Sequence, residues 1–231
     1  MKLTKLNDDS SWLWDISGIK VLVDPWFSKS QVDFHPLFSQ QFHVKEQTSM
    51  DEIPQVDFIF LSHPFTDHCN KETLLELDPT IPVICLPSIQ KKVQKWRHFQ
   101  SFISLENAPF ELEKISVTSL IDLVHHAYLI SDGTQAFCYA PHGCKSILPN
   151  KKAQLLITTT TTYSLPFFLG GTVNLGVGKA LDLAEKLAAT QLISTHDEVK
   201  IQKGIVAVLS KRTFANHPGV LALQPFESFE F

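Results

Sequence analysis

Hydrophobic and polar positions near the start of the chain follow the pattern of β-strands. Residues 11–16 (SWLWDI) and 19–24 (IKVLVD) are apolar segments separated by a Ser-Gly pair, and Pro25 follows the second one. A turn signal between two such segments predicts a β-hairpin that opens the fold. Residues 26–54 are aromatic and polar without a clear period. We expect a long loop there.

The following segments alternate between strand and helix patterns. Residues 56–61 form a short apolar run typical of a buried strand, and residues 70–77 have helix composition after an asparagine cap. Residues 82–86 repeat the strand pattern, and residues 88–97 repeat the helix pattern with an expected serine cap. Alternation of this kind predicts parallel strand pairing.

The second half of the chain combines both kinds of pairing. Several short strands are expected from residue 102 to residue 139, with a hairpin turn at residues 131–134. Further along, the pattern predicts a strand at 154–158, a loop of threonines and aromatic residues, a helix at 177–189 and a strand at 191–195. We therefore expect one mixed α/β domain over residues 1–231.

Composition and charge narrow the choice of partners. Hydrophobic residues make up 44% of the 231 residues, so the chain can form a substantial core. The net charge of −4 arises from 20 basic and 24 acidic residues scattered along the sequence. Neither a nucleic acid nor a membrane is expected as a partner. The expected partner is a small-molecule substrate. The composition does not indicate the oligomeric state.

The cysteines favour a reducing compartment. Cys69, Cys85, Cys138 and Cys144 contain no CxxC pair, and we recognise no secretory signal. Reduced thiols and a cytoplasmic location are the expectation.

Candidate metal ligands gather in the segment LSHPFTDHCN, residues 61–70. His63, Asp67 and His68 lie there after a predicted strand, and His196 follows another one. Transition metals take nitrogen and oxygen ligands, and ligands of α/β proteins gather beyond the carboxyl ends of strands. The alternative is structural, because Asp67 could cap the following helix and each histidine could be a hydrogen-bonded core residue.

In this order, these features resemble the metallo-β-lactamase fold family. That family has an Asp-Pro after the opening hairpin, as in Asp24-Pro25, then the motif HxHxDH, and a histidine after a late strand. The chain looks closest to the branch that includes ascorbate-6-phosphate lactonase-like proteins. It is also similar to a subgroup from cyanobacteria and plants that carries the Pro-His-Gly found at residues 141–143 and the Gly-Lys-Ala-Leu found at 178–181. The resemblance implies a four-layer αββα sandwich of two mixed sheets flanked by helices.

The resemblance also implies which residues bind metal. Asp67, His68 and His196 match the second metal site of the two-metal family members, whereas Phe65 takes the place of a first-site histidine. His142 stands near the place of the bridging aspartate. These departures favour one divalent metal, zinc first and iron or manganese as alternatives, or no metal in a degenerate site. The expected metal ligands are His63, Asp67, His68, His142 and His196, and the expected catalytic residues are Asp67, His63 and His142.

Two functions remain open from the sequence. One is a metal-dependent hydrolase of a small ester, lactone or phosphate-bearing substrate, in which His63 and His142 complete the ligand set or act on a bound water. The other is a protein that has lost its metal and acts as a binding or scaffolding module, as Phe65 suggests.

Two neighbouring features carry further expectations. Asp197-Glu198 either orients the His196 ring through a hydrogen bond or forms an exposed acidic turn. Strand alternation predicts that one of His125 and His126 points inward and the other is exposed.

Overall fold

The protein is described by a computed structural model, which covers residues 1–45, 47–118 and 122–231. The chain divides into two compact units. The first unit comprises Met1–Pro109, Val199–Lys203 and Gln224–Phe231. The second unit comprises Phe110–Glu198 and Gly204–Leu223.

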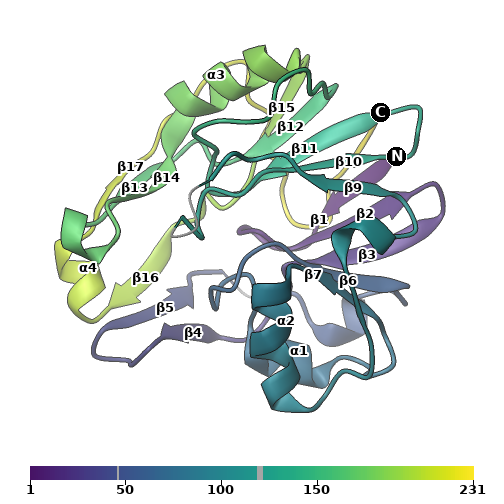
Figure 1. Ribbon diagram of the computed structural model, residues 1–231. Helices are drawn as coiled ribbons and strands as arrows, with labels where there is room; N and C mark the ends of the chain where they lie inside the picture. The colour runs from purple at the N-terminus through teal and green to yellow at the C-terminus, as the bar shows by residue number, and fades with distance from the viewer. Residues whose placement is uncertain (46, 119–121) are drawn as a thin grey trace. The chain divides into compact units, whose positions relative to one another are not determined.

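The main sheet of the first unit is mixed and has seven strands, in the order β18-β1-β2-β3-β6-β7-β8 (Figure 1). The four strands from β18 to β3 are antiparallel, and β3, β6, β7 and β8 pair in parallel. Their bounds are β1 Lys2–Lys5, β2 Trp12–Ile16, β3 Ile19–Val23, β6 Phe58–Leu61, β7 Val83–Cys85, β8 Phe102–Ile103 and β18 Ser228–Glu230.

The opening hairpin is confirmed as β2 and β3. Ser17 and Gly18 both have positive φ, as a tight two-residue hairpin turn requires. The tryptophans of β2, Trp12 and Trp14, are fully buried, and the residues beside them are partly exposed. One face of the hairpin therefore contributes to the core.

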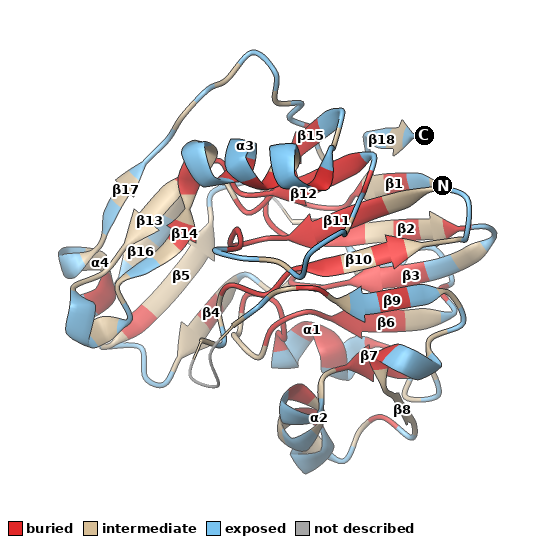
Figure 2. Cartoon of the chain, turned by 45° about the horizontal axis from the view of Figure 1, so that its top comes forward, coloured by how far each residue is buried: buried red, intermediate tan, exposed pale blue. Residues whose placement is uncertain are grey.

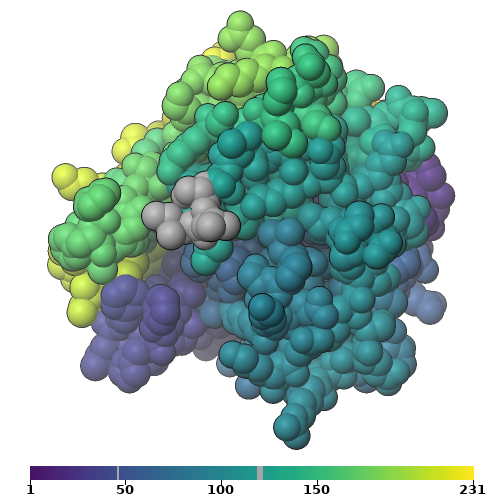
Figure 3. All heavy atoms as spheres, viewed as in Figure 1, coloured from purple at the N-terminus to yellow at the C-terminus, as the bar shows by residue number. Residues whose placement is uncertain are grey.

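Two short helices, α1 (Lys71–Glu76) and α2 (Pro87–Val93), follow β6 and β7. Asn70 caps α1, because its side chain accepts a hydrogen bond from Thr73 N at 3.0 Å. The expected serine cap of α2 is wrong: Leu86 is the N-cap and Pro87 holds the first turn. The buried residues of both helices join one apolar cluster with β6 and β7, and their outer sides form part of the surface in Figure 3.

The expected long loop over residues 26–54 is also wrong. It contains β4 (Ser30–Asp33) and β5 (Ser39–His43), an antiparallel hairpin that joins β16 (Lys200–Lys203) in a three-stranded sheet. The segment is polar and lacks clear alternation, so its period gives no strand signal. Its strand partner β16 lies far along the sequence.

A mixed sheet of five strands forms the centre of the second unit, in the order β15-β12-β11-β10-β9. The hairpin of β10 and β11 is antiparallel as predicted, and β11, β12 and β15 are parallel. Helix α3, Gly176–Leu187, buries Ala180, Leu183 and Leu187. Figure 2 shows this helix with pale blue exposed parts and red buried parts. The strands are β9 Glu111–Lys114, β10 Tyr128–Ser131, β11 Ala136–Ala140, β12 Leu155–Thr158 and β15 Gln191–Ser194.

The threonine and aromatic segment before α3 is more regular than expected. It contains β13 (Thr162–Ser164) and β14 (Thr172–Leu175), which form a three-stranded sheet with β17 (Lys211–Thr213). Strand β14 leads directly into α3, and a short helix, α4 (Ile205–Leu209), precedes β17.

Two expectations on environment can be compared with the structure. All four cysteines are free and buried, as predicted for reduced thiols. In the described part of the chain, every helix is too short or too polar to cross a membrane.

Candidate functional site

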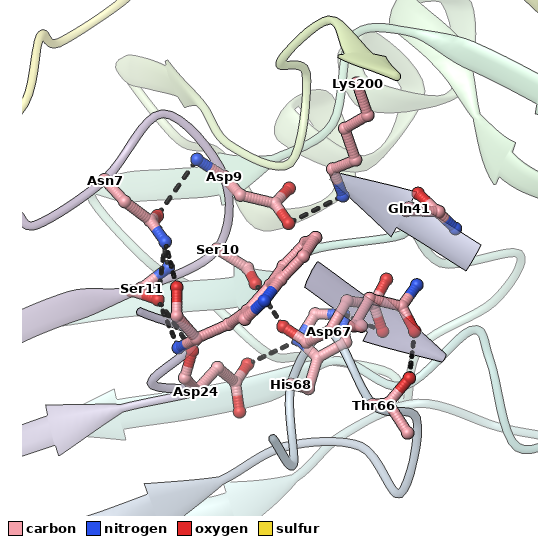
Figure 4. A network of polar contacts seen from close by, with 12 residues as sticks. Asn7, Asp9, Ser10, Ser11, Asp24, Gln41, Thr66, Asp67, His68 and Lys200 are labelled. Carbon is pink, nitrogen blue, oxygen red and sulfur yellow. Dashed lines mark hydrogen bonds and ion pairs between the residues drawn. The ribbon is translucent and has the colours of Figure 1, made fainter. Parts of the chain in front are cut away.

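In the first unit, His68 is held by a buried carboxylate. Asp24 directly follows β3, is fully buried, and its Oδ2 lies 2.8 Å from His68 Nδ1 (Figure 4). A carboxylate only accepts hydrogen bonds, so Nδ1 carries the hydrogen and the neutral ring has its lone pair on Nε2. This is how metal-binding histidines are oriented in proteins.

Ser62 extends the same argument to His63. Asp24 accepts hydrogen bonds from Ser62 N at 2.8 Å and from Ser62 Oγ at 2.5 Å. The hydroxyl has one hydrogen and gives it to the carboxylate, so it accepts in its 2.6 Å contact with His63 Nδ1. His63 therefore also carries its hydrogen on Nδ1 and has its lone pair on Nε2.

Asp67 adds an oxygen donor beside these rings. Its Oδ1 lies 4.0 Å from His68 Nε2, and the ring centres of His63 and His68 are 4.9 Å apart. Burial by itself lowers the pKa of His68, but the carboxylates of Asp24 and Asp67 outweigh it and raise that pKa. The carboxylates thus favour positive charge beside this ring, which either a second proton or a metal ion on Nε2 would supply.

Strand β4, which the sequence did not predict, is tied to the motif loop. Thr66 Oγ1 hydrogen-bonds to Gln31 and, at 2.7 Å, to Asp33 Oδ1. Burial and then the nearby Asp67 raise the pKa of the Asp33 carboxyl group. No motif or period marks Gln31 and Asp33 in the sequence.

An ion pair between Lys200 of β16 and Asp9 lies in the same unit. Lys200 Nζ is 2.6 Å from Asp9 Oδ2, and these side chains are 4% and 0% exposed. The ammonium group also lies 4.9 Å from the centre of the Trp26 ring. Figure 4 shows this pair within a network that includes Asn7 and Ser11.

The second unit holds His142 by neutral groups. Asn174 Oδ1, at the end of β14, lies 2.8 Å from His142 Nδ1, and both residues are buried. Leu175 N donates to the His142 carbonyl at 3.1 Å. Because an amide oxygen only accepts, His142 carries its hydrogen on Nδ1 and presents Nε2 as an acceptor.

His196 lies next to His142 within this unit, with the ring centres 4.7 Å apart at 85°. The carboxylate of Asp197 accepts hydrogen bonds from the threonines 159–161, so the prediction that Asp197 orients the His196 ring is wrong. The exposed acidic turn is wrong too, because Glu198 is buried and Asp197 is half-buried. The threonines follow β12 and lie far from Asp197 in the sequence, so no local pattern links them to it.

The prediction that one of His125 and His126 is exposed is wrong. Both are buried, and both lie before β10, so the alternation of a strand does not apply to them. His125 Nδ1 is 2.9 Å from Asp122 Oδ1, and its Nε2 is buried without a hydrogen-bond partner among the described residues. Hydrogen bonds from His125 outweigh the effect of burial and lower the pKa of Asp122. In the sequence, only the pair of adjacent histidines before a predicted strand pointed to His125.

Phe65 is half-buried in the motif loop, and its carbonyl accepts hydrogen bonds from His68 N at 3.1 Å and Cys69 N at 2.7 Å.

Cys69 is not suited to bind metal or act as a nucleophile, because burial raises the pKa of its thiol to about 12. The donors suited to a divalent metal are therefore imidazole nitrogens and one carboxylate, a set that fits zinc, iron or manganese.

The comparisons with known proteins agree with this fold. A family model described as a beta-lactamase superfamily domain matches residues 2–196. No curated protein sequence matches the chain.

Solved structures cover the whole chain at low sequence identity. An isothiocyanate hydrolase from Delia radicum gut bacteria is 14% identical with a TM-score of 0.72, over 100% of this chain and 99% of that one. A possible metal-dependent hydrolase from Veillonella parvula DSM 2008 is 12% identical with a TM-score of 0.68, over 99% and 98%. The metallo-beta-lactamase fold protein YhfI from Bacillus subtilis is 15% identical with a TM-score of 0.61, over 99% of each chain.

These likenesses confirm the predicted α/β fold of the metallo-β-lactamase type. The family model covers most of the sequence, from the opening hairpin to His196. The chain belongs to the beta-lactamase superfamily.

Proposed function

We propose that this protein is a metal-dependent hydrolase with a reduced, one-metal site. The substrate is a small ester, lactone or phosphate-bearing molecule, and zinc is the first candidate for the metal. Solved relatives described as hydrolases support this class of reaction. The proposed ligands are Asp67, His68 and His196, joined by His63 and His142.

The observation that carries the proposal is the placement of the imidazole hydrogens. His63, His68 and His142 each have Nδ1 engaged by a hydrogen-bond partner within their own unit. Their Nε2 atoms therefore carry the lone pairs of the neutral rings. Three buried rings with this orientation fit metal binding better than a structural role, in which either nitrogen would serve.

When bound, a divalent ion would supply activation of a water molecule and polarisation of a carbonyl or phosphoryl oxygen. Asp24 keeps the His68 ring oriented with Nε2 as its donor atom. Asp67 provides the negative charge that the ion requires. His63 and His142 either complete the ligand set or accept a proton from water through Nε2.

The test is metal content and stability. Protein purified without chelator is analysed for bound metal, and the unfolding midpoint is compared with and without added zinc. Zinc at about 100 times its Kd should add about 2.7 kcal/mol to the free energy of unfolding. The Asp67→Ala, His68→Ala double variant should lose this effect.

The matched control is Asp51→Ala, His35→Ala, which removes an exposed carboxylate and an exposed imidazole from the same unit. It should bind zinc like the wild type. Metal content that is negligible and equal in wild type and double variant would overturn the proposal. Hydrolysis of aryl esters, lactones and phosphodiesters by zinc-loaded protein would then identify the substrate class.

The second candidate function is a metal-free binding or scaffolding module, which Phe65 in the HxHxDH motif favours. Phe65→His separates the two candidates, because the side chain is half-buried and an imidazole fits there without a core cavity. Tighter zinc binding by the variant supports the hydrolase. An unchanged absence of zinc binding supports the module.

A further inference from the structure

The carboxylate of Asp197 ends a hydrogen-bond network that metal binding alone does not explain. It accepts from Thr159 Oγ1 at 2.6 Å, Thr160 N at 2.8 Å, Thr160 Oγ1 at 2.7 Å and Thr161 N at 2.9 Å. Four bonds to one carboxylate fix it firmly relative to the segment after β12.

The residue before this carboxylate has an uncommon backbone conformation. His196 has a φ of +59°, in the left-handed region. A side chain larger than glycine persists there only when its surroundings determine the conformation. Thr195 N, which donates to Thr158 O at 3.1 Å, holds the chain before His196, and Asp197 holds it after. The threonine segment thus keeps His196 in place from both sides.

The same network determines the orientation of Asn174. Thr159 has one hydroxyl hydrogen, and both Asp197 Oδ1 at 2.6 Å and Thr161 O at 3.3 Å can only accept it. Thr159 Oγ1 must therefore accept in its 3.3 Å contact with Asn174 Nδ2. The amide nitrogen faces Thr159, so the amide oxygen faces His142.

We propose that Asp197, Thr159 and Asn174 form a relay that fixes His142 as the Nδ1–H tautomer, with the lone pair of the ring on Nε2. They are positioning residues, since the relay acts on His142 and Asp197 also holds the backbone of His196. Their role in metal binding rests on the proposed function. The tautomer itself does not rest on the proposed function. Every group of the relay belongs to the second unit, and its hydrogen bonds form without a metal.

The test reads the tautomer directly in metal-free, full-length protein. Nitrogen-15 NMR of the histidine rings distinguishes a protonated from an unprotonated nitrogen, and the His142 signals are assigned by their loss in His142→Gln. The wild type should show Nδ1 protonated and Nε2 unprotonated at neutral pH. A wild-type His142 with its hydrogen on Nε2 would overturn the relay without any variant.

Thr159→Val and Thr160→Val are a matched pair. Each removes one hydroxyl bond to Asp197, at 2.6 and 2.7 Å, but only Thr159 also accepts from Asn174. Thr159→Val should shift His142 to a mixture of tautomers, Thr160→Val should leave it unchanged, and Thr159→Ser should restore the wild-type signals. An equal change in both valine variants would assign these threonines a general structural role and contradict the relay.

Zinc affinity provides a second measurement. Asn174→Leu should weaken zinc binding by about 10-fold or more, as is typical when the partner of a ligating histidine is removed. Wild-type protein that shows the predicted tautomer but binds no metal would overturn the proposed function and leave the relay standing.

Discussion

In the first unit, the carboxylate of Asp24 contacts the His68 ring directly. In the second unit, the amide of Asn174 contacts the His142 ring, and the hydroxyl group of Thr159 links that amide to the carboxylate of Asp197. Each unit also contains a hydroxyl group that donates its single hydrogen to an aspartate: Ser62, which contacts His63, in the first unit, and Thr159, which contacts Asn174, in the second. The outcome is the same tautomer in both units.

The difference lies in charge. Hydrogen bonds to a charged group are roughly twice as strong as neutral ones. Asp24 also raises the pKa of His68, after burial has lowered it, whereas His142 has a neutral partner. We therefore expect the first unit to depend more strongly on its carboxylate than the second depends on Asn174.

The largest effect is expected for Asp24→Ala. It leaves the buried Ser62 and His68 without the acceptor of three hydrogen bonds, which should lower the free energy of unfolding by about 3–5 kcal/mol. Urea denaturation measures this value.

A control for this prediction is Asp132→Ala. Asp132 Oδ1 also accepts three hydrogen bonds, from Thr134 N, Thr134 Oγ1 and Gln135 N, but in a hairpin turn that solvent reaches. The loss there should stay near 1 kcal/mol. Equal losses in both variants would show that burial of Asp24 has no special importance.

A smaller effect is expected for Asn174→Leu. The variant keeps the side-chain volume and leaves His142 Nδ1–H without its acceptor, which should cost about 1–3 kcal/mol. Asn107→Leu is the control, because Asn107 is exposed and its side chain donates to Ser104 Oγ at 2.9 Å. A loss for Asn174→Leu as large as that for Asp24→Ala would refute the difference between the two units.

The smallest signal is expected from the thiols, which are divided between the units. Burial raises the pKa of Cys69 and of Cys85 to about 12 in the first unit and also raises the pKa of Cys138 and Cys144 in the second. At pH 8 a disulfide reagent should therefore leave all four thiols unmodified in native protein and react with all four in urea.

Intermediate urea concentrations allow the same labelling experiment to compare the two units. Peptide mapping of the labelled cysteines shows which unit opens first. Labelling of Cys138 in native buffer at the rate of a free thiol would contradict the buried placement.

Local signals in the sequence predicted the elements that local interactions determine. The Asn70 cap, the β2–β3 turn and the apolar face of α3 all depend on residues close in sequence, and all three are confirmed. The prediction of a loop over residues 26–54 failed because β5 pairs with β16. Phe42 lies opposite Ile201, which is more than 150 positions away in the sequence.

The same limit applies to the site. The motif residues His63, Asp67 and His68 could be identified from their spacing and from the family resemblance. Their partners could not, because Asp24 is 44 positions from His68, and Asn174 is 32 from His142. The fold brings these partners together, so no local sequence pattern indicates them.

Strand β16 also bears on how the protein can be made. The five-residue segment that contains it, Val199–Lys203, belongs to the first unit, and Lys200 forms an ion pair there with the buried Asp9. Asp9 is synthesised long before Lys200, so the nascent amino-terminal part lacks this ion pair during most of translation. A fragment that ends at residue 109 would lack Lys200 altogether. To fold stably, it would need either a peptide that supplies Lys200 or a neutral residue in place of Asp9.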